Sequence, residues 1–441
     1  MLALIAGLRK RGLRVAPFKK GPDFIDPAWI SVLADQPCYN LDPYLMDEST
    51  ILAMLNRHSA MADIVLVEGN HGIFDGVDEK GSVSSARLAK ILRAPVILVL
   101  DCQGMSATAA AVVLGIQQFD PDCTIAGVIL NRLAGERHER VVTAAIRDRT
   151  TVPIVGAIHR RDDAPLEERH LGLLPPCESG RQASVERVSD VMSEALDVEQ
   201  ICRIAESAPP LDFSPQTGKS RAIHTEPVRI GLIRDDAFQF YYQDNLDALR
   251  EHGADLVELS AIHTEKLPSL DLLYIGGGFP ERHAERLANN RELMAEIRTA
   301  ERRGMPIYAE CGGALYLGRS IAYEGRHFEL VGIFPIDYAF RNRPYGHGYL
   351  RGRVVAENPF YSIGTELVGH EFHYSRPSAW EESQLTLVCQ LSKGYGFDGA
   401  RDGLCQNRTF AAYCHVHVAG MPTWPTALVT AAAVYRRERC G

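Results

Sequence analysis

The sequence repeatedly alternates short, uniformly apolar runs with segments of helical spacing. The runs are rich in β-branched residues, as expected of strands that are buried on both faces of a parallel sheet. In the first half of the chain they are residues 63–68, 95–101, 124–131 and 152–158. Segments with helical periodicity, such as 84–92 and 107–119, lie between them. This alternation predicts a doubly wound α/β domain.

A second series of the same kind follows a break. Residues 207–227 are rich in proline, serine and charged residues and show no periodicity, which is typical of a linker. Beyond this segment the apolar runs are 228–233, 254–260, 271–278 and 305–310. We therefore predict two α/β domains, residues 1–206 and 228–441, joined by the linker 207–227.

Length and composition limit the classes of partner. A chain of 441 residues agrees with two domains that each bury a core. The net charge of −9 argues against a nucleic-acid partner, because such partners are bound through Lys and Arg. No run approaches about 18 uninterrupted apolar residues, so no membrane span is expected. The N-terminus has no signal-peptide pattern, and the ten scattered cysteines favour reduced thiols in a cytoplasmic protein.

The strongest chemical signal is a cysteine at a predicted strand-to-helix turn. Cys311 directly follows the apolar run 305–310 and precedes Gly312 and Gly313. A turn with such small neighbours is the setting of a nucleophile elbow. It exposes the side chain and aims it at the start of a helix, where the dipole favours a thiolate. The amide of Gly312 is then placed to stabilise an oxyanion.

A cysteine nucleophile needs a base, and two downstream histidines are candidates. His415 and His417 lie two residues apart in FAAYCHVHV (410–418), on one face of an expected strand. We expect His415 to activate Cys311 and His417 to orient His415. Gly277 and Gly278 end another strand of the same sheet, so their amides should complete the oxyanion hole at its carboxyl edge.

Four segments of this half resemble the glutamine amidotransferase domain of the cobyrinic acid a,c-diamide synthase family. They are IYAECGGALYLG, LYIGGGFPERHA, IRDDAFQFYYQDNL and GHEFHYS. The resemblance implies a class I glutamine amidotransferase-like α/β domain. In it, Cys311 attacks the side-chain amide of glutamine, forms a glutamyl thioester and releases ammonia. His415 matches the histidine of the family.

The first half resembles the same family along most of its length. The segments are RVAPFKKGPDFIDPAWI (14–30), YNLDPYLM (39–46), VLVEGNHGIFDG (65–76), APVILVLD (94–101), GVILNRLAGERHERV (127–141) and APLEERHLGLLP (164–175). They are similar to the family's ATP-dependent amidoligase domain, which is similar to dethiobiotin synthetase. Their common order supports the resemblance.

Charged residues in these segments are candidates for the ATP-dependent site. Glu68 ends a strand just before a glycine, where a carboxylate can bind magnesium (Mg2+) beside nucleotide phosphates. Asp23 and Asp26 lie in a Gly/Pro loop after another strand, where they are expected to share the metal or position the substrate. Lys19 and Lys20 are expected to meet phosphate or a substrate carboxylate.

The resemblance adds further binding residues. Asn131 ends a strand and resembles the family's base-recognition asparagine. Asp42 lies in the matched segment YNLDPYLM. Arg169 and His170, in RHLGL, are expected to contribute to a substrate cleft between the domains.

One feature of the family is absent from the sequence. Relatives begin with a strand and a glycine-rich phosphate loop that ends in Gly-Lys-Thr, followed by a helix, whereas this sequence begins within that helix. The amides and lysine of such a loop hold the triphosphate. We expect a P-loop-type sheet that lacks its first strand, because of an incomplete N-terminus rather than a loss of ATP use.

The implied reaction is amidation of the a and c acetate carboxylates of a modified tetrapyrrole. ATP phosphorylates a carboxylate, and ammonia released from glutamine attacks the acyl phosphate. The segment RNRPYGHGYLRGR (341–353) offers a basic, aromatic wall to a polycarboxylate macrocycle. Cobyrinic acid and sirohaem stay rival substrates, since VEGNHGIFDG, PYGHGY and HVHVAGMPTW are closer to the sirohaem amidase branch. A nickel-sirohydrochlorin substrate is less favoured.

Two other functions stay open because the phosphate loop is absent. One is a catalytically degenerate protein that only binds a tetrapyrrole, and the other is a stand-alone glutaminase. The expected small-molecule partners are glutamine, ATP and the tetrapyrrole, and the sequence leaves a homodimer open.

Overall fold

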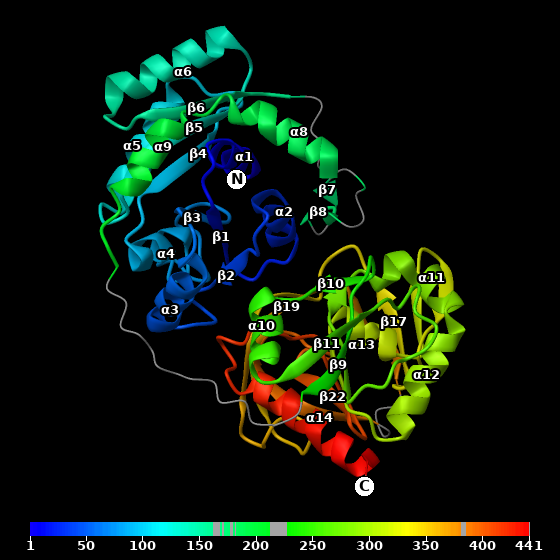
Figure 1. Ribbon diagram of the computed structural model, residues 1–441. Coiled ribbons are helices and arrows are strands. Elements are labelled where there is room, and N and C mark those ends of the chain that lie inside the picture. Colours follow the sequence, from blue (N-terminus) through cyan, green and yellow to red (C-terminus); the bar gives the residue numbers. More distant parts are fainter. Residues whose placement is uncertain are drawn as a thin grey trace. The chain divides into compact units, whose positions relative to one another are not determined.

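The computed structural model describes residues 1–161, 168–169, 172–176, 180, 182–211, 227–380 and 385–440. The chain divides into two compact units, Met1–Thr217 and Gly218–Gly441 (Figure 1). Parallel strands alternate with helices in both units, which confirms the predicted α/β class. Residues 212–226 of the expected linker lie outside the described residues, so the extent of the linker stays a prediction.

The first unit contains two parallel three-stranded sheets. In one, β1 (Val15–Lys20) lies between β2 (Tyr39–Leu41) and β3 (Ile64–Glu68). In the other, β5 (Ile125–Leu133) lies between β4 (Val96–Asp101) and β6 (Ile154–His159). The remaining elements are α1 (Leu2–Lys10), α2 (Ile25–Ala34), α3 (Glu48–Ser59), α4 (Ser85–Leu92), α5 (Thr108–Phe119), α6 (Glu136–Arg149), β7 (Glu168–Arg169), β8 (Gly172–Leu173), α8 (Gln182–Ser193) and α9 (Val198–Glu206).

Several helices of this unit begin at a capping side chain. The carboxylate of Asp47 accepts the N–H of Thr50 at the start of α3. The carboxylate of Asp197 accepts the N–H of Gln200 at the start of α9. Such caps satisfy amide groups that have no partner within the helix and stabilise it by about 1 kcal/mol each.

Two strands of the first unit are less buried than their sequence predicts. Among the described residues, β3 and β4 each pair with a neighbour on one side only. Val65 of β3 is 36% exposed and Val99 of β4 is 56% exposed. The prediction that both faces of these strands are buried is therefore wrong at these positions, because side chains of an edge strand lack cross-strand neighbours on one side.

The second unit is built on a ten-stranded sheet. Its strands are, in spatial order, β11 (Ala254–Leu259), β9 (Val228–Ile233), β12 (Leu272–Ile275), β14 (Ile307–Glu310), β23 (Thr409–Ala412), β22 (Arg401–Gln406), β21 (Thr386–Lys393), β18 (Gly346–Val354), β19 (Glu366–His373) and β24 (His415–Val416). The strands from β11 to β23 are parallel, and those from β23 to β24 pair in antiparallel fashion.

Smaller elements complete the second unit. The strands are β15 (Ser320–Tyr323), β16 (Arg326–Glu329), β17 (Ile336–Phe340) and β20 (Ser375–Trp380) in one sheet, and β10 (Phe238–Phe240) with β13 (Gly277–Gly278) in another. The helices are α10 (Gln243–Glu251), η1 (Pro280–His283), α11 (Ala284–Asn289), α12 (Arg291–Arg302), α13 (Gly312–Leu317) and α14 (Trp424–Cys440).

The parallel strands of the second unit carry an apolar core on each face. In β9, Ile230 and Leu232 pack in the cluster that contains Trp424 of α14. Ile233 belongs to the cluster that contains Ile297 of α12. Neighbouring side chains of a strand point to opposite faces, so helices on both faces give the doubly wound arrangement that was predicted.

Candidate active site

Cys311 occupies a strained turn between β14 and α13. Its φ is 45° and its ψ is −101°, a backbone conformation that costs a residue with a side chain about 1–3 kcal/mol. A Cβ at Gly312 would lie 3.0 Å from the amide nitrogen of Gly278, and one at Gly313 would lie 2.4 Å from the carbonyl oxygen of Ile275. A side chain at position 313 would therefore collide with the backbone and one at position 312 would be tightly crowded, as a nucleophile elbow requires.

The electrostatic environment of Cys311 differs from the expectation that the turn favours a thiolate. The side chain is buried, and this burial raises the pKa of the Cys311 thiol. The nearby carboxylate of Glu281 raises it further, whereas the amide of Gly312 lowers it. The thiol therefore stays protonated near neutral pH and needs a base to react.

His415 lies on β24 and faces a carboxylate that the sequence did not single out. Its Nδ1 is 3.3 Å from Oε2 of Glu310, the residue directly before Cys311. Both residues are 2% exposed. Because a carboxylate only accepts hydrogen bonds, a neutral His415 carries its proton on Nδ1 and leaves Nε2 unprotonated. This is the tautomer that a general base for a thiol requires.

Glycines connect His415 to the elbow. A Cβ at Gly277 would lie 2.4 Å from Cε1 and 3.2 Å from Nε2 of His415, so the catalytic edge of the ring lies against Gly277. On the other side, Gly312 lies against Gly278. The segment that was predicted to complete the oxyanion hole thus lies between the candidate base and the elbow. The hydroxyl of Tyr241 accepts the N–H of Gly276 at 2.7 Å and so anchors the residue directly before Gly277.

His417 does not take the orienting role that was predicted for it. Its Nδ1 accepts the N–H of Ala419 at 3.1 Å, and its Nε2 lies 3.4 Å from Oδ2 of Asp244. Because β24 ends at Val416, the rule that residues two apart share a strand face no longer applies. Glu310 instead occupies the position at Nδ1 of His415.

In the first unit, Lys19 gathers three of the predicted site residues at the carboxyl ends of β1 and β3. Its Nζ lies 2.6 Å from Asp26, 2.9 Å from Glu68 and 3.7 Å from Asp23. Burial lowers the pKa of Lys19, but Glu68, Asp23 and Asp26 together raise it above its ordinary value. Burial, and then repulsion by Asp26, raises the pKa of Asp23 to about 6.

Of the other predicted residues of this half, Lys20 and Asp42 lie at the paired strands β1 and β2, whereas Asn131 lies in the other sheet. Lys20 is buried, and burial lowers its pKa, which the charge of Asp42 partly offsets. Asp42 accepts the N–H of Tyr44 at 2.7 Å. Asn131 ends the segment of β5 that pairs with β4, and its Oδ1 accepts the N–H of Arg132 at 3.0 Å.

Some of the predictions fall at or beyond the limits of the described residues. Arg169 is part of β7, but its side chain lies outside the described residues, as does all of His170. Within the described part of the chain, no cluster of three or more His, Cys, Asp or Glu could hold a metal ion by itself. None of the helices there is long and apolar enough to cross a membrane.

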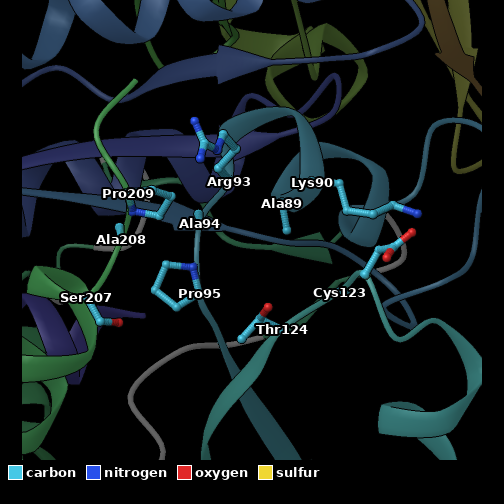
Figure 2. A pocket seen from close by; sticks show the side chains of 11 residues that line it. Ala89, Lys90, Arg93, Ala94, Pro95, Cys123, Thr124, Ser207, Ala208 and Pro209 are labelled. Atoms are coloured by element: carbon cyan, nitrogen blue, oxygen red, sulfur yellow. The ribbon is translucent and has the colours of Figure 1, made fainter. Parts of the chain in front are cut away.

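A surface hollow of about 400 Å³ lies at the amino ends of β4 and β5 (Figure 2). Its lining includes Lys90, Arg93, Thr124 and Pro209. Ligands of open α/β sheets bind at the carboxyl ends of the strands. The hollow therefore lies at the wrong edge to belong to the candidate ATP site.

Comparisons with known proteins identify the family. Residues 229–422 match the CobB/CobQ-like glutamine amidotransferase domain, and residues 40–165 match an AAA domain. The chain is 42% identical to the cobyrinate a,c-diamide synthase of Magnetococcus marinus, over 99% of this chain and 94% of that one. The chain belongs to the cobyrinate a,c-diamide synthase family. The synthase of Archaeoglobus fulgidus is 39% identical over 94% of this chain and 90% of its own length.

Membership of the cobyrinate a,c-diamide synthase family confirms the resemblance inferred from the sequence, and with it a carbon–nitrogen ligase that contains a glutamine amidotransferase domain. The amidotransferase match includes Cys311 and His415, and the AAA match includes Glu68 and Asn131. Among solved structures, a glutamine amidotransferase of Thermotoga maritima matches 48% of this chain and 92% of its own, with 16% identity and a TM-score of 0.33.

Proposed function

We propose that this chain transfers the amide nitrogen of glutamine to the a and c acetate carboxylates of cobyrinic acid in an ATP-dependent reaction. The arrangement of Cys311, His415 and Glu310 is the observation that supports the proposal most directly. It combines a protonated, buried thiol with an imidazole whose Nδ1 faces a carboxylate. The names of the relatives supply the substrate.

Glutamine hydrolysis would begin at Cys311. Its thiol proton passes to Nε2 of His415 while Sγ bonds to the amide carbon of glutamine. The amides of Gly312 and of the Gly277–Gly278 segment stabilise the resulting oxyanion. The C–N bond breaks as His415 returns the proton to the leaving nitrogen, which departs as ammonia. Water then hydrolyses the glutamyl thioester to glutamate.

The amidation step would take place in the first unit. The γ-phosphoryl group of ATP is transferred to a substrate carboxylate, and ammonia attacks the acyl phosphate, so that phosphate leaves. Lys19 and Lys20 would compensate the negative charge, and Asn131 would recognise the base. Arg169 and His170 remain proposed contacts of the substrate.

The carboxylates around Lys19 fit a magnesium ion. Magnesium in nucleotide sites binds one or two protein carboxylates, while phosphates and water supply the remaining oxygens. Glu68 and Asp23 are such carboxylates, and both already converge on one cation, the ammonium of Lys19. A bound magnesium ion would offset the charge of the transferring phosphoryl group.

A cationic aromatic cluster in the second unit is a candidate contact for the macrocycle. The guanidinium carbon of Arg341 lies 3.5 Å from the ring centre of Tyr345, and that of Arg376 lies 5.2 Å from the same centre. Guanidinium groups bind carboxylates in bidentate fashion and stack on planar rings. The cluster can therefore bind both the carboxylates and the planar ring of a polycarboxylate tetrapyrrole.

The proposal is tested by following the nitrogen atom. The chain is incubated with magnesium-ATP, glutamine labelled with heavy nitrogen in its amide, and either cobyrinic acid or sirohaem. Mass spectrometry measures label in the macrocycle, and released glutamate is counted in parallel, with Cys311→Ser as the control. Labelled cobyrinic acid supports the proposal, whereas label in sirohaem alone assigns the other substrate.

Two further outcomes contradict the proposal. Glutamate without a labelled macrocycle indicates a glutaminase whose ATP-dependent half is inactive. Neither product, from folded protein that still binds a tetrapyrrole, indicates a degenerate binding protein. Size-exclusion chromatography of the same sample tests whether the chain forms a homodimer.

A further inference from the structure

The candidate base lies on a very short strand at the end of the sheet. β24 comprises two residues and pairs with β19 through His370 opposite His415 and Gly369 opposite Val416. Beyond Val416 the chain leaves the sheet and turns, with the N–H of Gly420 donating to the carbonyl of His417. Few backbone hydrogen bonds hold this strand, so its neighbours decide where the imidazole of His415 points.

One of these neighbours is the segment Tyr242–Asn245, at the start of α10. The side chain of Asn245 is buried; it donates to the carbonyl of Val416 at 2.6 Å and accepts the N–H of Val418 at 2.7 Å. These two bonds hold the chain immediately after His415. Within the same segment, Asp244 faces His417.

The second neighbour is His370 of β19. Its ring stacks on that of His415, with centres 5.0 Å apart and planes inclined by 24°. The hydroxyl of Tyr242 lies 3.0 Å from Nδ1 of His370, and both residues are buried. Burial, followed by the adjacent His415 and His417, lowers the pKa of His370 well below its ordinary value. His370 is therefore neutral and acts on His415 through contact and shape rather than charge.

We propose that His370, held by Tyr242, positions the imidazole of His415 for proton transfer with Cys311, and that Asn245 fixes the strand that carries this imidazole. The inference rests on the proposed glutaminase role of Cys311 and His415. It assigns a role to parts of IRDDAFQFYYQDNL and GHEFHYS that the reaction itself does not use. His370 is a positioning residue, because it contacts the base and takes part in no bond that forms or breaks.

The test compares variants that keep or remove the stacked ring, with glutamate release by the full chain measured against glutamine concentration. His370→Ala removes the ring, and His370→Phe restores a ring without nitrogen atoms. Misplacing a reacting group by about 1 Å can cost about a hundredfold in rate, so we expect His370→Ala to lower kcat about tenfold to a hundredfold with KM within about threefold. His370→Phe should recover most of the lost kcat.

A second pair of variants tests the anchor. Tyr242→Phe removes the hydroxyl that holds His370 and should lower kcat by about threefold to tenfold, again with little change in KM. The matched control is Gln243→Ala in the same segment. The side chain of Gln243 hydrogen-bonds to Asp247 and not to β24, so this variant should keep the parental kcat.

Three results would overturn the inference: a parental kcat in His370→Ala, a change in KM alone, or a His370→Phe variant as slow as His370→Ala. If thermal melting shows that His370→Ala does not fold, Tyr242→Phe decides, and a parental kcat in that variant refutes the role of His370. Failure of the proposed function is distinguishable, because the parental chain then releases no glutamate. In that case the rate at which iodoacetamide alkylates Cys311 is compared, and equal rates in the parent and Tyr242→Phe overturn the positioning role.

Discussion

Replacing Glu310 by glutamine tests the central arrangement of the candidate site. The substitution keeps the size of the side chain and its reach to Nδ1 of His415, but it removes the negative charge. In the parental chain Oε2 of Glu310 lies 3.3 Å from Nδ1 of His415, and both side chains are buried. In the proposed mechanism, this charge stabilises the imidazolium that forms when His415 takes the proton of Cys311.

The expected loss of rate follows from the strength of a hydrogen bond between His415 and the charged Glu310. A hydrogen bond to a charged group contributes about 1.5–3 kcal/mol, and each 1.36 kcal/mol corresponds to about a factor of ten in rate. The separation of 3.3 Å is long for such a bond, which favours the lower part of this range. We expect Glu310→Gln to lower kcat for glutamate release by about tenfold to a hundredfold, with KM changed by less than about threefold.

The assay is glutamate release by the full chain at varied glutamine concentration. Glu285→Gln serves as the control, because Glu285 forms an exposed ion pair with Arg326 on the surface of the same unit. Such an exposed pair contributes about 0–1 kcal/mol, so the control should keep the parental kcat. A parental kcat in Glu310→Gln would refute the role of Glu310 in orienting His415.

Three further predictions concern single charged or titratable groups. Because burial raises the pKa of the Cys311 thiol, iodoacetamide should alkylate it more slowly than free cysteine at neutral pH, with a rate that rises steadily into the alkaline range. Lys19→Met leaves three converging carboxylates without their cation and should destabilise the first unit by about 3–5 kcal/mol, measured by chemical denaturation. Burial raises the pKa of Asp23 from 3.8 to about 6, so its ionised form destabilises the folded chain as the pH rises through this range. Asp23→Asn keeps the oxygen that accepts the N–H of Ile25 and should raise the melting temperature at pH values above 6 but not below 3.8.

The parallel strands of both units follow directly from the sequence, whereas much of the second sheet does not. The run 228–233 is apolar except for Arg229 because helices cover both faces of the sheet, and it appears as β9 with the same bounds. The antiparallel strands alternate instead. In β18, exposed His347 and Arg351 alternate with buried Gly346 and Leu350, so the strand lacks the continuous apolar run on which the prediction relied.

The same contrast applies to the candidate site. Cys311 and the glycines around it are recognisable because an elbow restricts residue size at adjacent positions. Glu310 carried a usable signal, since an acidic residue at the end of an otherwise apolar buried strand needs a partner. The partner itself depends on pairing between β14 and β23, where Glu310 lies opposite Ala412, and the stacking of His370 on His415 depends on pairing between β19 and β24. No spacing along the chain encodes these pairings, so these contacts could not be predicted.

In the proposed mechanism, burial of Cys311 gives a reason for a carboxylate as well as a base. In a buried site, a lone thiolate or a lone imidazolium is costly, because neither charge is solvated. Proton transfer from Cys311 to His415 creates both charges together, and their mutual attraction offsets part of this cost. The imidazolium of His415 would also lie beside the carboxylate of Glu310, whose negative charge stabilises it. On this proposal the thiol remains protonated and unreactive until glutamine is bound. The free-energy cost of the proton transfer is still low enough for the reaction to proceed once the substrate is present.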